Sequence, residues 1–137
     1  MVKLKLKIIT PRKIIKEEEV DSISVPTSDG EITILPKHIN LFTLLKEGIV
    51  KIKTGDKEDY LAIGGGYLQT DGYLVNLLVS RAYGQSEIDE KLTQKAIEEA
   101  KTLIKQSKDE KEKAEAISLL RRSMIDFKLL KRRKKVK

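Results

Sequence analysis

The chain has 137 residues, of which 36% are charged, and it carries a formal net charge of +7. It contains no cysteine, which excludes disulfides, a thiolate nucleophile and a cysteine metal site. No apolar run reaches the roughly 18 residues that a membrane-spanning helix needs, and the amino terminus alternates lysine with aliphatic residues where a signal peptide would be apolar. We therefore expect a soluble or peripheral protein with one core and an appendage.

The first part of the chain reads as a series of short strands. Apolar residues alternate with lysines at 2–8, which predicts a strand with one apolar and one cationic face. Further strands are predicted at 13–19, 20–25, 31–35, 41–45, 49–53, 60–63, 67–70 and 73–79. Pro26 is expected to end one of them and Pro36 another, and Asp71-Gly72 is a hairpin signal. About eight to ten strands without intervening helices predict an antiparallel β-sandwich or flattened barrel.

Two features of this part invite a functional interpretation. The triple glycine at 64–66 resembles a phosphate loop, but no Lys-Ser/Thr follows it, and a bend or bulge in a strand is the prediction. His38 is the one histidine, either a turn residue or a contact residue on an exposed loop. Because no carboxylate pair lies in an apolar setting that would tune an acid, we expect no enzymatic activity, and neither a metal nor a catalytic site.

The second part of the chain is predicted to be helical. All three prolines and all eight glycines precede Ser86, which forms a capping-box-like pair with Asp89. Apolar residues then recur at helical spacing in two runs, which are Leu92, Ala96, Ala100 and Leu103, followed by Ala114, Ile117, Leu120, Met124, Phe127 and Leu130. An antiparallel two-helix hairpin is predicted. The fold class is thus α+β, with a β-sandwich domain at 1–85 and a helical domain at 86–137.

The segment that joins the two helical runs, 105–113, carries neither Gly nor Asn, although a tight helix end usually does. Most of its residues are good helix formers. We therefore hypothesise that the hairpin is bistable, folded in one state and extended as a longer helix in another.

The basic charge is concentrated at the carboxyl terminus. From Arg121 onward, nine Lys and Arg residues face one Asp, which gives this tail a charge of +8. Its partner could be nucleic acid, anionic lipid or an acidic protein surface. Aromatic residues are few and are not interleaved with the basic run, which removes the stacking that single-strand binding uses, whereas binding to duplex phosphates stays open.

Three short segments, and their order along the chain, are distinctive. Thr10-Pro11 follows the first strand, Gly-Glu-Ile-Thr-Ile-Leu-Pro-Lys-His occupies 30–38, and Ala-Ile-Gly-Gly-Gly-Tyr-Leu occupies 62–68, ahead of the helical hairpin. In this order the chain resembles the epsilon subunit family of F-type ATP synthase, called delta in mitochondria. The resemblance covers essentially the whole chain.

The resemblance implies a non-catalytic subunit of the rotating central stalk, which takes part in proton-driven ATP synthesis. Its partners would be the gamma subunit, the c-ring and the alpha and beta catalytic subunits. The family's region that faces the c-ring and gamma corresponds to Glu31, Pro36 and His38. In bacterial members the hairpin extends and inhibits ATP hydrolysis, and the basic residues implied to meet the beta subunit are Arg121, Arg122, Lys131, Arg132 and Arg133.

The resemblance also bears on cofactors and location. Some members bind ATP through Ile/Leu-Asp-x-x-Arg-Ala, but Leu92-Thr93 replaces Arg-Ala here, so no cofactor is required. A nucleotide site, if formed, would use Ile88, Asp89 and Arg122. The implied location is peripheral, on the cytoplasmic face of a bacterial plasma membrane, or on an organellar inner or thylakoid membrane. The alternative function is a small nucleic-acid or anionic-surface binding module that uses the basic tail.

Overall fold

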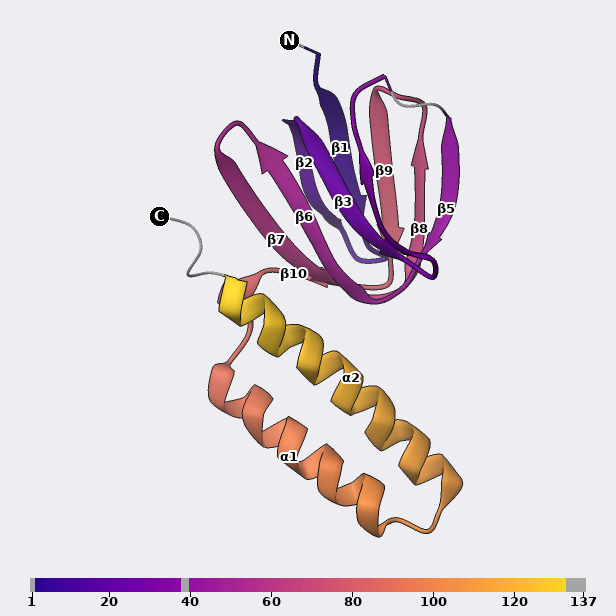
Figure 1. The fold of residues 1–137 in the computed structure, drawn as a ribbon, viewed down its shortest axis with the longest axis vertical. Coiled ribbons are helices and arrows are strands. Elements are labelled where there is room, and N and C mark those ends of the chain that lie inside the picture. The colour runs from indigo at the N-terminus through magenta and orange to yellow at the C-terminus, as the bar shows by residue number, and fades with distance from the viewer. Residues whose placement is uncertain (1, 38–39, 133–137) are drawn as a thin grey trace. The chain divides into compact units, whose positions relative to one another are not determined.

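The computed structural model describes residues 2–37 and 40–132. The chain divides into two compact units, one that ends at Gly84 and one that begins at Gln85. In Figure 1 the first unit consists of strands and the second of helices. The predicted α+β architecture, a β-sandwich followed by a helical hairpin, is confirmed.

The first unit contains two five-stranded sheets. Sheet A has the order β2-β1-β9-β8-β5, with bounds Ile14–Val20, Leu4–Ile9, Leu74–Val79, Gly66–Thr70 and Leu41–Leu45. Sheet B has the order β10-β7-β6-β3-β4, with bounds Ala82–Tyr83, Lys57–Ile63, Gly48–Thr54, Ser22–Thr27 and Gly30–Ile34. The neighbouring strands pair antiparallel, apart from the parallel pair of β1 and β9.

The core lies between the sheets and uses one face of each strand. On β1 the side chains of Leu4, Leu6 and Ile8 are fully buried, while the lysines between them lie on the opposite face. The same alternation on the other strands completes one apolar cluster, which includes Ile23, Val25, Ile34, Val50, Ile52, Ile63, Leu68, Val75 and Leu77. All its members come from residues 4–82, so the first unit has a core of its own.

Two details differ from the expectation. Pro26 does not end a strand but lies inside β3, opposite Glu31 of β4. The proline is tolerated because β3 pairs with β6 only through Ser22–Ser24, so at Pro26 no β6 partner requires an amide hydrogen. The two-residue strand β10 was not predicted, because two residues are too short to show a periodicity.

Three connections that cross between the sheets meet at one end of the sandwich, and we call their meeting point the crossover cluster. They contribute Glu47 after β5, Gly64 after β7 and Arg81 after β9. The Arg81 guanidinium lies 3.0 Å from Glu47 Oε2, and the Gly64 amide donates to the Arg81 carbonyl at 3.0 Å. The triple glycine therefore ends β7 and begins β8, so it connects strands of two sheets and is not the predicted bend or bulge within one strand.

The second unit consists of a short 3-10 turn, Gln85–Glu87, and two helices, α1 at Glu90–Gln106 and α2 at Glu110–Arg132. The helix α1 begins later than predicted. Its cap is Asp89, whose carboxylate accepts from the Leu92 amide at 3.0 Å, and not Ser86, because Ser86 is taken up by the preceding turn.

The two helices lie antiparallel and pack against each other (Figure 1). The buried residues of the two helices are Thr93 and Ala100 on α1 and Ala116, Ser123 and Leu129 on α2. Two large side chains of the predicted stripes are instead exposed, Leu92 at 64% and Met124 at 48%. The predicted hairpin is therefore correct, but the predicted apolar stripes only partly coincide with the buried residues.

The two helices are joined by residues 107–109, and α1 ends there without a glycine. Ser107 is extended, with φ −74° and ψ 137°, and its amide still donates to Leu103. The Asp109 amide donates to Ser107 Oγ, and the Asp109 carboxylate accepts from the Lys111 amide at 3.2 Å. Serine and aspartate side chains thus accept from amides of the connection and of the first turn of α2, and the chain reverses without a glycine.

Candidate functional site

The predicted interface residues Glu31 and Pro36 lie at opposite ends of one strand. Glu31 is the second residue of β4, next to the Ser28-Asp29 turn, whereas Pro36 follows the end of β4. Five extended residues span about 16 Å, so the two side chains belong to different surfaces. His38 lies outside the described residues.

The connection after Pro36 is fixed to a neighbouring turn, and we call the end of the sandwich that they share the loop end. Lys37 adopts a left-handed backbone with φ 67°, which is uncommon for a residue with a side chain. Its amide donates to the Gly72 carbonyl at 2.8 Å, which explains why this conformation is retained. The β4–β5 connection and the β8–β9 turn are thereby joined.

The β8–β9 turn is organised by Asp71. Its carboxylate accepts from the amides of Tyr73 and Leu74 at 2.9 and 2.8 Å. The hydrogen bond from Leu74, followed by that from Tyr73, lowers the pKa of the Asp71 carboxyl from its ordinary value. The charged form of this side chain therefore stabilises the turn to which Lys37 is attached.

We expect Asp71→Asn to lower the thermal unfolding midpoint at pH 7, because the amide accepts the same bonds without a charge. A lowered pKa contributes stability that is present above the ordinary value of 3.8 and is lost as the pH falls through the folded value. The difference from the unmodified chain should therefore shrink as the pH falls below 3.8, and calorimetry from pH 7 to about pH 2 measures it. Asp56→Asn, in the β6–β7 turn, is the control; a difference that persists unchanged in acid would contradict the assignment.

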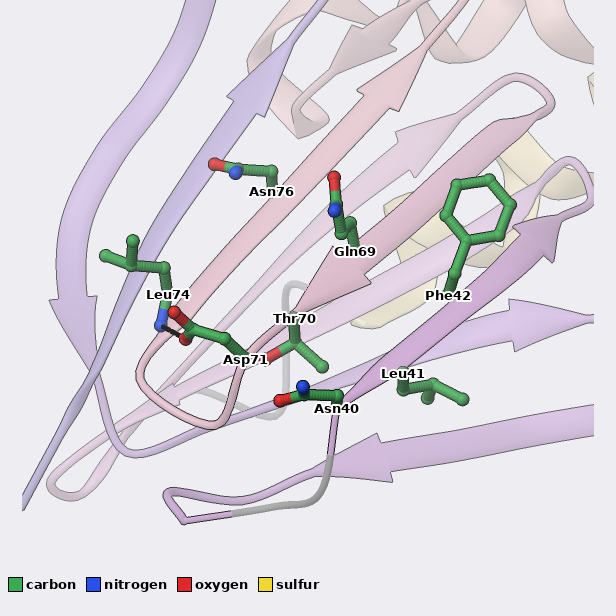
Figure 2. A pocket seen from close by; sticks show the side chains of 8 residues that line it. All are labelled: Asn40, Leu41, Phe42, Gln69, Thr70, Asp71, Leu74 and Asn76. Atoms are coloured by element: carbon green, nitrogen blue, oxygen red, sulfur yellow. Dashed lines mark hydrogen bonds between the residues drawn. The ribbon is translucent and has the colours of Figure 1, made fainter.

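The outer face of sheet A carries a hollow of about 440 Å³ beside the loop end (Figure 2). Amide side chains of two neighbouring strands, Gln69 and Asn76, lie directly opposite each other in the sheet. Phe42 of β5 lies opposite Gln69 on the other side. The remaining lining residues are Asn40, Leu41, Thr70, Asp71 and Leu74. The lining of the hollow can therefore both donate and accept hydrogen bonds, and it includes the apolar side chains of Leu41, Phe42 and Leu74.

Apolar side chains continue from the hollow along the edge strand β5. Phe42 is 60% and Leu44 is 68% exposed, although both are large apolar side chains. The Phe42 ring lies 5.0 Å from the ring of Tyr67, which faces outward from β8. We call Phe42, Leu44 and Tyr67 the apolar patch. Contiguous exposed apolar residues of this kind mark interaction surfaces.

The strand at 41–45 is predicted from the sequence, but without an interaction role. All its residues but Thr43 are apolar, so the alternation that separates an inner from an outer face is missing. The absence of a polar outer face in a short edge strand was itself the signal, since edge strands usually carry charges.

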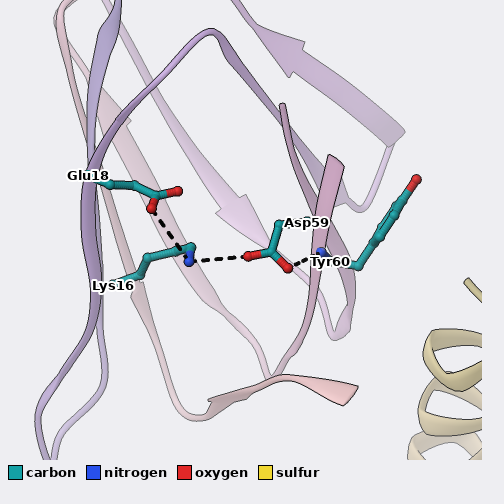
Figure 3. A network of polar contacts seen from close by, with 4 residues as sticks. All are labelled: Lys16, Glu18, Asp59 and Tyr60. Carbon is teal, nitrogen blue, oxygen red and sulfur yellow. Dashed lines mark hydrogen bonds and ion pairs between the residues drawn. The ribbon is translucent and has the colours of Figure 1, made fainter. Parts of the chain in front are cut away.

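The opposite edge of sheet A does carry charges, as Figure 3 shows. Lys16 of β2 lies 3.7 Å from Glu18 of the same strand and 3.2 Å from Asp59 of β7 in sheet B. Asp59 also accepts from the Tyr60 amide at 3.0 Å. Exposed ion pairs contribute little stability, but inward-pointing charges protect an open edge from pairing with other chains. The β2 edge is therefore protected, whereas β5 offers the apolar patch.

The predicted residues of the helical unit lie just before α1 and on α2. Ile88 is half-buried, and Asp89 is engaged as the cap of α1. Arg121, Arg122, Lys131 and Arg132 lie exposed on α2, and the Lys131 ammonium sits 4.7 Å above the Phe127 ring. Arg133 lies outside the described residues. The basic residues thus share one helix, and the nucleotide site at Ile88, Asp89 and Arg122 stays a prediction.

The described residues form neither a metal-binding cluster nor a membrane-spanning helix. Within 2–37 and 40–132, no group of three or more His, Asp or Glu side chains is placed to hold a metal ion. No helix in this part of the chain is long and apolar enough to cross a membrane.

The chain is similar to delta and epsilon chains of ATP synthase. Residues 3–85 match the family model of the ATP synthase delta/epsilon chain, β-sandwich domain. The chain is 34% identical to the chloroplastic ATP synthase epsilon chain of Marchantia polymorpha, over 88% of this chain and 90% of that one. It is 37% identical to the ATP synthase epsilon chain of Dehalococcoides mccartyi, over 98% and 97%.

Solved structures agree. The mitochondrial ATP synthase of Euglena gracilis, in an assembly of OSCP, F1 and c-ring, contains a chain that is 26% identical, with a TM-score of 0.73 over 96% of this chain and 79% of that one. The central stalk and c-ring structure of Tetrahymena thermophila contains a chain of the same fold, with a TM-score of 0.53 over 61% and 68% and an identity of 16%.

Proposed function

The chain belongs to the ATP synthase delta/epsilon family, and we propose that it is a non-catalytic subunit of the rotating central stalk of an F-type, proton-translocating ATP synthase. In this role it transmits rotation of the c-ring and gamma to the catalytic head and restrains ATP hydrolysis. The observation that carries the proposal is the similarity over 98% of the chain, which includes the hairpin as well as the sandwich. This likeness favours the stalk role over the alternative of a nucleic-acid or anionic-surface binding module.

The sandwich is the anchor in this proposal, and the apolar patch is its contact with gamma. Phe42 and Leu44 are more than half exposed, and covering them by a partner would remove that apolar area from water. The hollow beside them reaches Asn40 and so connects the patch to the loop that carries Pro36 and His38. Glu31 lies at the other end of β4, next to an exposed polar turn, where it suits the polar loops of the c-ring.

The hairpin is the brake, and it acts by a shift between two populations. In the folded form the helices bury small side chains, Ala100, Ala116 and Ser123 among them, and one large side chain, Leu129. An alanine removes much less apolar surface from water than a leucine, so most of the buried positions contribute little to the stability of the folded form. Electrostatic contacts between the basic residues of α2 and an acidic surface of the beta subunit then favour the extended form.

ATP hydrolysis by a reconstituted catalytic head with gamma tests both roles. Three versions are compared: the full chain, a chain that ends at Gly84, and a full chain with Arg121, Arg122, Lys131, Arg132 and Arg133 changed to alanine. We expect the first to suppress hydrolysis, and the other two to bind gamma but leave the rate at least about threefold higher, since several exposed ion pairs of a few tenths of a kcal/mol each are lost.

Each other outcome has a distinct meaning. If the chain that ends at Gly84 fails to bind gamma, the sandwich is not the anchor. If all three versions bind and hydrolysis is equal, the hairpin is not a brake in this protein. The proposed location follows from the complex: the chain is peripheral to the membrane, on the cytoplasmic face of a bacterial plasma membrane or on the corresponding face of an organellar one.

A further inference from the structure

One hydrogen bond joins the two ends of the helical unit across 44 residues of sequence. The Gln85 side chain donates from Nε2 to the main-chain carbonyl of Leu129 in α2, at 2.7 Å. Gln85 is the first residue of the helical unit, and it lies in the short turn that precedes α1. The bond therefore ties the last part of α2 to the start of the hairpin.

Both partners of this bond are held in place. The Gln85 carbonyl accepts from the Ile88 amide at 3.1 Å, which closes the turn and fixes the backbone that carries the glutamine. Leu129 is fully buried, with 0% of its surface exposed. The bond itself is part-buried, and removing its donor leaves the carbonyl of a buried residue without this partner, which costs free energy.

The buried side chains of the two helices are mostly small, namely Thr93, Ala100, Ala116 and Ser123, and Leu129 is the one large side chain among them. The hydrogen bonds of Ser107 and Asp109 at the opposite end are local to the connection and cap helix ends. The Gln85 bond is thus a side-chain contact that spans the open end of the hairpin and is broken when α2 departs from α1.

We propose that Gln85 is the latch of the hairpin: its bond to the Leu129 carbonyl sets the ratio of the folded to the extended form. This regulatory role rests on the proposed function, in which extension of the helices inhibits ATP hydrolysis. The latch adds a specific residue to that equilibrium, and this residue lies outside the basic surface of α2.

The full chain can test the latch by itself, because it contains no cysteine and accepts two unique spin labels. Lys91→Cys and Lys128→Cys place the labels on exposed positions at the open end, one on each helix. In the folded hairpin the helix axes are roughly 10 Å apart. If α1, the connection and α2 become one helix, the rise over the 37 steps from residue 91 to residue 128 separates the labels by about 55 Å.

We expect Gln85→Met, which keeps the length of the side chain but removes the donor, to raise the ratio of long to short distances by roughly threefold to tenfold. Gln94→Met is the matched control, since it makes the same change at an exposed position of α1 and should leave the ratio unchanged. Hydrogen exchange at the α2 amides detects openings too rare for the distance measurement and should accelerate by the same factor. Circular dichroism checks that the helices are intact.

Equal ratios and equal exchange rates in Gln85→Met and the unmodified chain would overturn the latch, as would an equal effect of Gln94→Met. These measurements use the isolated chain and do not depend on ATP hydrolysis. If Gln85→Met opens the hairpin, but removing the basic residues or the hairpin leaves the rate of ATP hydrolysis unchanged, the role of Gln85 is supported and the inhibitory role of the hairpin is contradicted. If removing the basic residues raises the rate of ATP hydrolysis, but Gln85→Met leaves the ratio of long to short distances unchanged, the inhibitory role of the hairpin is supported and the role of Gln85 is contradicted.

Discussion

Gly66→Ala is expected to destabilise the sandwich by about 3 kcal/mol, which lowers the unfolding midpoint of a domain of this size by roughly 15 °C. A Cβ at this position would overlap the Leu78 carbonyl oxygen and lie 2.7 Å from Val79 Cα. Both obstacles are main-chain atoms of β9, which is paired with β8 at this position. They cannot move without displacing β9, a strand that contributes Val75, Leu77 and Val79 to the core.

Gly65, the neighbour of Gly66 in the triple glycine, provides the control for Gly66→Ala. A Cβ on Gly65 would meet only the Leu45 carbonyl, at 3.5 Å, which is an ordinary contact. Gly65→Ala should therefore change the midpoint by far less than Gly66→Ala. Thermal unfolding followed by circular dichroism compares the two. Equal midpoints in the two variants would mean that β9 relaxes around the added methyl group and that close approach is not the reason for the glycine.

The double change Phe42→Ser and Leu44→Ser is expected to weaken binding to gamma roughly 100-fold while the sandwich stays folded. Large apolar anchors at the centre of an interface cost the most when they are removed. The two side chains are 60% and 68% exposed in the free chain, so the core loses little when they are replaced. Titration calorimetry with gamma measures the affinity, and thermal unfolding of the free variant measures the fold.

A matched control lies on the same face of the same sheet. Lys5 and Glu19 face each other across β1 and β2 and are exposed. Changing both to serine removes two side chains from the outer face of sheet A at its other edge, and gamma binding should stay within about threefold. A control that weakens binding as much as the patch variant would place the contact elsewhere on the sheet.

The sequence was sufficient for the architecture because local patterns report local structure. Alternation at 2–8 predicts β1 with its buried Leu4, Leu6 and Ile8, and the strand at 41–45 coincides with β5. The freedom from proline and glycine after Gly84 predicts the helices. The order of the Gly-Glu, Leu-Pro-Lys-His and Gly-Gly-Tyr-Leu segments identified the family, to which the chain belongs.

Predictions that depend on a choice between two similar local signals were less accurate. Ser86 and Asp89 both suit a helix start, and the choice of Asp89 depends on the turn that Gln85 begins. Leu92 and Ala100 lie on the same predicted stripe, yet only Ala100 is buried. A periodicity gives the direction of a helix face within tens of degrees, whereas close packing of two helices selects the smallest side chains within that face.

The sequence by itself thus determined the two units, their order, the family and the basic character of α2. Only the tertiary structure decided that Glu31 and Pro36 belong to different surfaces, that Gly66 and not Gly65 is held by close approach, that Phe42 and Tyr67 meet, and that Gln85 reaches Leu129. The reason is physical. Backbone preference and periodicity act over a few residues, whereas these relations join strands and helices that are distant in sequence and are set by how the chain packs.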